Sequence, residues 1–121
     1  MKFTKPYNCG WNLYEGSAAY SENPKVLFEK TLPPIFEYHN DSENKQTPGR
    51  AIVAGYYVKD KNVFVFADFV SKYVYILQPH DDQKMWTQVG KVETSDTILS
   101  LGKTDDKLFV LNSDGVYSLE L

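Results

Sequence analysis

The chain has 121 residues, a length typical of one domain, and 42% of them are apolar, as in an ordinary globular protein. A net charge of −3 offers no basic surface for nucleic acid, and no apolar run is long enough to span a bilayer. The first residues lack the charged and apolar regions of a secretory signal peptide, so we expect no signal peptide in this chain.

Residues 1–50 are predicted to be rich in loops, because Pro, Gly, Asn and Asp interrupt them repeatedly. Only "PPIFEY" (33–38) has the composition of a short strand, and "NDSENKQTPG" (40–49) predicts a surface loop because it has no apolar residue. Cys9 is the single cysteine, so no disulfide forms within the chain. It is either a structural thiol or a thiol whose partner lies in sequence outside this chain.

Residues 51–121 predict an antiparallel meander. Turn sequences such as "KDKN", "DDQK", "TDDK" and "NSDG" separate short runs rich in β-branched and aromatic residues. No window longer than ten residues has the periodicity of a helix. The predicted strands are 51–58, 63–69, 72–78, 85–92, 97–102, 107–112 and 115–120.

Several of these strands are apolar on both faces. In "VFVFADF" (63–69), neither the Val and Ala side chains nor the Phe side chains offer a face to solvent. A strand with one wet face alternates apolar and polar residues, so these strands need cover on both sides.

The strands also form an internal repeat, in which three segments of the first unit align with three of the second. Ile52–Gly55 aligns with Ile98–Leu101 at an offset of 46, Val63–Phe66 with Leu108–Leu111 at 45, and Val74–Leu77 with Val116–Leu119 at 42. A period of about 40–50 residues with four short strands per unit is typical of a β-propeller blade. Each blade is covered on both faces by its neighbours, which accounts for the two-sided apolar strands.

We therefore predict an all-β fold of about two propeller blades, with a four-stranded blade at 51–92 and a three-stranded blade at 97–121. Residues 1–50 are predicted to be an inter-blade loop region with one short strand. A ring needs at least four blades, so two alone leave apolar faces uncovered and favour association. The alternative is a generic β-sandwich whose repeat is coincidental.

The motifs "CGWNLYEGSAAY" (9–20), "PPIFEYHND" (33–41), "GRAIVAGYYVKD" (49–60) and "ILSLGKTDDKLFVLNSDGVYSLEL" (98–121) occur in an order that resembles the glucose/sorbosone dehydrogenase family. This family includes quinoprotein sugar dehydrogenases and hedgehog-interacting-protein-like proteins. The resemblance implies a six-bladed propeller, of which this chain is the last third, and an extracellular or secreted location. It departs at Ser17, where relatives tend to carry a cysteine.

In the dehydrogenase members, the resemblance implies pyrroloquinoline quinone (PQQ) and calcium in a central funnel, with a catalytic histidine that takes a proton from the sugar. We find no counterpart of that histidine. His39 and His80 lie in polar loops and are predicted to be solvated. We therefore expect no catalytic residue in this chain. We also expect no metal site at the adjacent His80, Asp81 and Asp82, because consecutive residues do not readily converge on one ion.

Three residues are candidate cofactor contacts. Arg50 opens the first strand of a blade and has the chemistry to hold a carboxylate of an anionic cofactor, or it is a surface residue at a loop end. Lys72 lies near the sequence position at which quinone-binding relatives tend to carry a basic residue, or it is a lysine in a turn between strands. Asp68 interrupts an apolar strand, so it is either a turn cap or a functional polar group. Glu15 is predicted to brace the opening loop.

Three functional hypotheses follow. The first is a part of a sugar dehydrogenase-like propeller, whose relatives act on a sugar or another small alcohol, with the chain alone not catalytic. The second is an extracellular protein-binding propeller module of the hedgehog-interacting type, with a protein or the missing blades as its partner. The third is an independent small β-domain.

Overall fold

The computed structural model describes residues 6–22, 24, 26–38, 50–80 and 85–121. The chain forms two compact units, Met1–Glu37 and Tyr38–Leu121. The boundary lies earlier than the expected division near residue 50, because Tyr38 belongs with the second unit. Among the described residues, no helix has the length and apolar character needed to cross a membrane.

The first unit is a small hairpin with a loop folded against it. Strands β1 (Tyr14–Glu15) and β2 (Ala18–Ala19) pair in antiparallel fashion, and Gly16 supplies the positive φ of 60° that their turn needs. A single 3₁₀ turn, η1 (Phe28–Lys30), lies further along. Tyr14 anchors the unit, since its hydroxyl donates to the carbonyl of Val26 at 2.9 Å.

The short strand predicted at 33–38 is wrong. These residues are extended but pair with no strand in the described part of the chain. Pro33 and Pro34 have no backbone N–H to donate, so this segment is poorly suited to a ladder. Glu37 instead accepts a hydrogen bond from the backbone N–H of Ser17 and so braces the β1–β2 turn, the role expected of Glu15.

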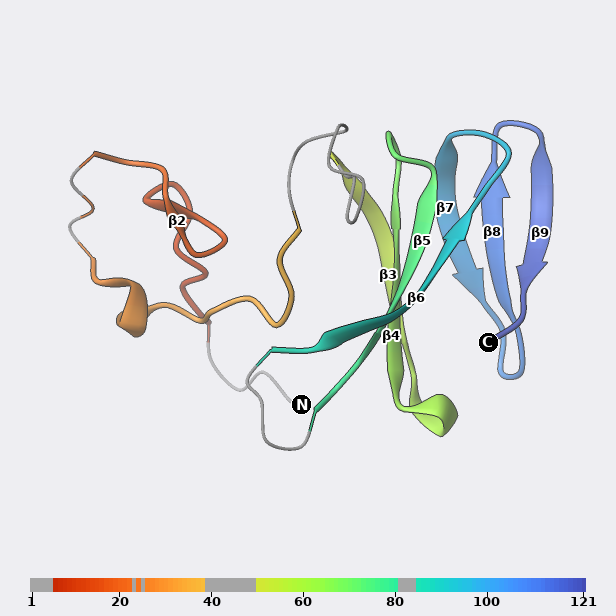
Figure 1. Ribbon diagram of the computed structural model, residues 1–121, viewed down its shortest axis with the longest axis horizontal. Helices are drawn as coiled ribbons and strands as arrows, with labels where there is room; N and C mark the ends of the chain where they lie inside the picture. The colour runs from red at the N-terminus through yellow and green to blue at the C-terminus, as the bar shows by residue number, and fades with distance from the viewer. Residues whose placement is uncertain (1–5, 23, 25, 39–49, 81–84) are drawn as a thin grey trace. The chain divides into compact units, whose positions relative to one another are not determined.

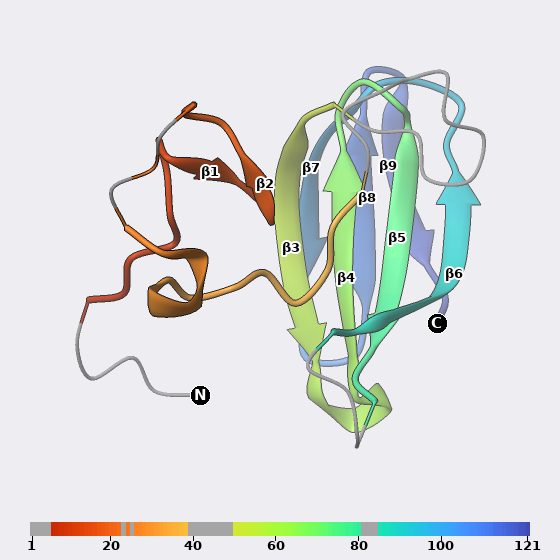
Figure 2. The same cartoon turned by 60° about the vertical axis from the view of Figure 1, so that its left-hand side comes forward.

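The second unit contains two antiparallel sheets that pack face to face, as Figures 1 and 2 show. In the four-stranded sheet the order is β3 (Ile52–Val58), β4 (Val63–Asp68), β5 (Tyr73–Gln78) and β6 (Thr87–Glu93). In the three-stranded sheet it is β7 (Ile98–Lys103), β8 (Leu108–Asn112) and β9 (Gly115–Leu119). A second 3₁₀ turn, η2 (Lys59–Lys61), connects β3 and β4.

All seven strands predicted between residues 51 and 121 are confirmed to within two residues at each end. The all-β, antiparallel organisation is therefore confirmed. The described residues form the two-stranded sheet of the first unit and the two open sheets of the second, with no closed ring among them.

The main core lies between the two sheets. Its members are aliphatic residues that are almost completely buried: Val63, Val65, Ala67, Val74, Ile98, Leu101, Leu108 and Val110. Those in β4 and β8 occupy alternate positions, which is the period of two that a strand requires; the others come from β5 and β7.

The opposite face of the four-stranded sheet is also buried, as the two-sided apolar strands predict. Phe66 and Tyr75 stack with ring centroids 4.9 Å apart, and both are at most 3% exposed. Tyr38 lies over them, with centroids 5.7 Å from Phe66 and 5.8 Å from Tyr75. A segment outside the meander therefore covers part of this face.

The predicted repeat extends to strand register. Ile52 pairs with Asp68 and Ile98 with Asn112, and each pair is followed by a register shift on the first strand. The offsets of 46 for β3 and β7 and of 42 for β5 and β9 agree with the pairing.

The offset of 45 for β4 and β8 is wrong by one, because the pairing on both sides of these strands requires 44. A shift of one residue reverses the faces of a strand, so only the offset of 44 makes Asp68 equivalent to Asn112.

Candidate functional site

The structure brings the three candidate residues to one end of the four-stranded sheet. Arg50 precedes β3, Asp68 ends β4 and Lys72 precedes β5. In an antiparallel sheet, the start of one strand lies beside the end of the next, so these three positions lie at the same end of the sheet.

Asp68 is the centre of this end. It is completely buried, at 0% exposure, and both carboxylate oxygens accept hydrogen bonds. Oδ2 accepts from Tyr38 Oη, Arg50 N and Ala51 N, each at 2.7 Å; Oδ1 accepts from Val70 N at 3.0 Å and Ser71 N at 2.7 Å. One side chain thus joins the β4–β5 turn, the start of β3 and the covering tyrosine.

These bonds decide the charge of the group. Burial alone raises the pKa of Asp68, but the donors from Ser71, Tyr38, Arg50 and Ala51 outweigh it, and the net pKa is below the usual value. Burial, followed by the bond to Asp68, raises the pKa of Tyr38 far above its usual value. At neutral pH, Asp68 is therefore a carboxylate and Tyr38 a neutral donor.

Arg50 and Lys72 contribute to the same end in different ways. The backbone N–H of Arg50 binds Asp68, whereas its side chain is exposed. Lys72 lies in the β4–β5 turn with a φ of 64°, and its ammonium nitrogen is 3.6 Å from Asp96 Oδ1. Both side chains of this pair are more than two-fifths exposed, so the pair contributes at most about 1 kcal/mol.

The fit of these residues to the implied cofactor is incomplete. The two cations have a charge suited to an anionic quinone, but a carboxylate has about four lone-pair positions, and Asp68 already accepts five bonds from the chain. For calcium, the described ranges contain no group of three or more acidic, histidine or cysteine residues placed to hold a metal ion. We therefore derive no quinone chemistry for this chain.

His80 is exposed after β5, and His39, Asp81 and Asp82 lie outside the described residues. Cys9 is a free, exposed thiol in the first unit.

The three-stranded sheet has an equivalent cap that the sequence did not single out as a site. The side-chain oxygen of Asn112 accepts from Asp114 N at 3.2 Å and Gly115 N at 3.1 Å, as Asp68 does two and three residues along its own turn. Its amide nitrogen donates to Ser95 Oγ at 3.1 Å. The turn signal "NSDG" was visible in the sequence, but its equivalence to the turn after Asp68 required the corrected offset.

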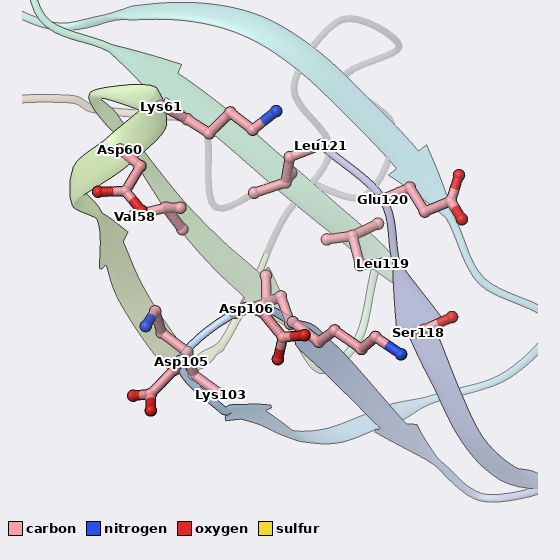
Figure 3. A pocket seen from close by; sticks show the side chains of 12 residues that line it. Val58, Asp60, Lys61, Lys103, Asp105, Asp106, Ser118, Leu119, Glu120 and Leu121 are labelled. Carbon is pink, nitrogen blue, oxygen red and sulfur yellow. The ribbon is translucent and has the colours of Figure 1, made fainter.

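A cleft of about 500 Å³ lies at the other end of the two sheets (Figure 3). The β3–β4 turn, the β7–β8 turn and the segment ending β9 surround it. Val58, Leu108, Leu119 and Leu121 give it an apolar lining. Its charged residues are of both signs: Asp60, Lys61, Lys103, Asp105, Asp106, Lys107 and Glu120. This lining selects no single ligand charge.

Comparisons with models of protein families, with curated proteins and with solved structures found no match for this chain.

Proposed function

We propose that residues 51–121 are two blades of a β-propeller of the glucose/sorbosone dehydrogenase type, and that the chain alone is not catalytic. The observation that carries this proposal is the repeat between the two sheets, which share register, the position of the register shift and the turn cap. Two sheets built alike and stacked on each other favour a larger array of the same unit.

The outer face of the three-stranded sheet supports the same proposal. Leu99, Leu111 and Val116 are 48%, 40% and 65% exposed there. By the repeat, Leu111 and Val116 are equivalent to Ala67 and Val74, which are completely buried against the next sheet. The outer face therefore has the pattern of a surface made to pack against a further sheet.

The sugar-oxidising chemistry, with its quinone and calcium, belongs in this proposal to full-length relatives. The alternative function is an extracellular protein-binding propeller module of the hedgehog-interacting type. Asp68 accepts five hydrogen bonds within the chain and so offers a calcium ion no free oxygen ligand.

The stacking face is tested by the association of the purified chain. We expect oligomers in size exclusion with light scattering, or binding of a hydrophobic dye, and we expect Leu111→Lys to reduce both. Ser113→Lys, in the exposed β8–β9 turn, is the matched control. A monomer with cooperative unfolding and no dye binding would support an independent small β-domain and overturn the proposal.

The non-catalytic assignment is tested separately. We expect the chain, supplied with PQQ and calcium, to bind neither by calorimetry and to show no dye-linked oxidation of glucose. Turnover by these 121 residues alone would contradict it.

A further inference from the structure

The two repeated sheets differ at one edge. In the four-stranded sheet, β5 pairs with β4 on one side and with β6 on the other. In the three-stranded sheet, β9 pairs with β8, and no strand among the described residues pairs with its other edge. Alternate residues of such an edge direct N–H and C=O groups outward, so the edge is a template for an added strand.

Strand β9 matches in sequence the strand β5, which pairs with a fourth strand in its own sheet. Val116, Tyr117 and Leu119 are equivalent to Val74, Tyr75 and Leu77 at the offset of 42. Val74 and Tyr75 are completely buried, whereas Val116 is 65% and Tyr117 49% exposed. The sequence of β9 is thus that of an inner strand, although its position is that of an edge.

The charges at the two ends of β9 favour a basic strand of another polypeptide over a second copy of this chain. Asp114 and Glu120 flank the strand and are exposed. A second copy that paired all of β9 in antiparallel register would centre on Tyr117 and place Asp114 opposite Glu120, so two pairs of like charges would face each other. Like charges directly opposite destabilise a sheet, whereas basic residues at those positions stabilise it.

The register of β5 with β6 predicts how an incoming strand lies. Val92 is opposite Val74 and Lys91 opposite Tyr75, while Glu93 and Thr87 mark the two ends. Transferred to β9, the pattern places an apolar residue opposite Val116 and a lysine opposite Tyr117. The hydroxyl of Tyr117 donates to Asp114 Oδ1 at 3.0 Å, so that lysine approaches a carboxylate.

We propose that the free edge of β9 is a docking site for an extended strand of another polypeptide, in which apolar and basic residues alternate and lysines lie at both ends. The strand adds antiparallel to β9 by main-chain hydrogen bonds. This inference rests on the repeat between the two sheets and not on the proposed propeller.

The experiment uses the full chain and synthetic peptides that copy residues 87–93. One peptide carries Thr87→Lys, which lies opposite Glu120 in this register, and Glu93→Lys, which lies opposite Gly115 and beside Asp114. The matched control carries Thr87→Glu and retains Glu93. We expect the lysine peptide to bind about tenfold more tightly at low salt by fluorescence anisotropy, with the difference reduced at high salt. Amide exchange should slow along β9 in the complex.

A charge reversal on the protein separates recognition from non-specific attraction. Glu120→Lys should lower the affinity for the lysine peptide and raise the affinity for the glutamate peptide, each by about threefold at low salt. Lys107→Glu, in the β7–β8 turn, is the control and should leave the order of the two peptides unchanged. Equal affinities for both peptides, or no slowing of exchange at β9, would overturn the proposal; so would a dimer whose own β9 is protected without peptide.

Discussion

At the scale of single residues, Asp68 shows how a buried charge becomes part of a fold. A carboxylate removed from water is costly unless hydrogen bonds replace its hydration. Here the donors come from three segments: the two residues before β3, the turn after β4 and Tyr38. The carboxylate therefore links one end of the four-stranded sheet to Tyr38, the residue that covers the face opposite the main core.

Asp68→Ala should lower the free energy of unfolding by about 3 kcal/mol, because it leaves the hydroxyl of Tyr38 and several backbone N–H groups without their acceptor. Asp105→Ala, at an exposed position, should change it by less than about 0.5 kcal/mol. Urea unfolding measures both. A loss below about 1 kcal/mol for Asp68→Ala would contradict the central role of this carboxylate.

The same group predicts acid sensitivity. The pKa of Asp68 is lower in the folded state than the value of about 3.9 expected when unfolded, so ionisation stabilises the fold above that value. This stability is lost as pH falls through the unfolded pKa toward the folded one. Unfolding free energies measured from pH 6 to about pH 2 should therefore fall more steeply in the wild type than in Asp68→Asn; parallel curves would refute this.

At the scale of elements, two strand glycines in the second unit have different reasons to be glycine. A Cβ on Gly55 in β3 would lie 2.6 Å from Phe64 Cζ, whereas a Cβ on Gly102 in β7 would meet nothing closer than 4.0 Å. The ring of Phe64 therefore fits against β3 only because position 55 has no side chain, whereas β7 has room for a side chain at position 102.

Gly55→Ala should cost about 1–3 kcal/mol, because the ring of Phe64 must move from its packed position. Gly102→Ala should be neutral or stabilise by up to about 1 kcal/mol, since alanine restricts the unfolded chain. Thermal and urea unfolding of the two variants provide the measurement. Equal effects would mean that the approach of Phe64 to β3 does not constrain position 55.

At the scale of the whole second unit, stability comes from packing one sheet on the other. Ile98 and Leu99 are adjacent in β7 but differ in exposure, at 0% and 48%. Ile98 belongs to the core between the sheets, whereas the side chain of Leu99 reaches solvent.

Ile98→Ala should therefore lower the free energy of unfolding by about 2–5 kcal/mol, and Leu99→Ala by less than about 1 kcal/mol. Both variants lose aliphatic volume at neighbouring positions of one strand, so the comparison isolates burial from strand propensity. If the costs in urea unfolding were reversed, the face of β7 that packs on the four-stranded sheet would have been assigned wrongly.

The sequence by itself determined the strands of residues 51–121, their turns and the existence of a repeat, because these depend on patterns a few residues long. It misplaced a strand at 33–38, where two prolines remove donors, and it shifted one alignment by a residue. Similar apolar residues on both faces of β4 made the two offsets indistinguishable in sequence, although they place opposite faces toward the core.

Only the tertiary structure decided the role of Asp68 and the equivalence of its cap with Asn112. The hydroxyl that binds Asp68 comes from a residue 30 positions earlier, and one of its backbone donors from 18 positions earlier. No local pattern encodes such distant partners, because they meet only when strand register and the covering segment are set together. For the same reason, the sequence identified β9 as a strand, whereas the sheet order showed that one of its edges has no partner among the described residues.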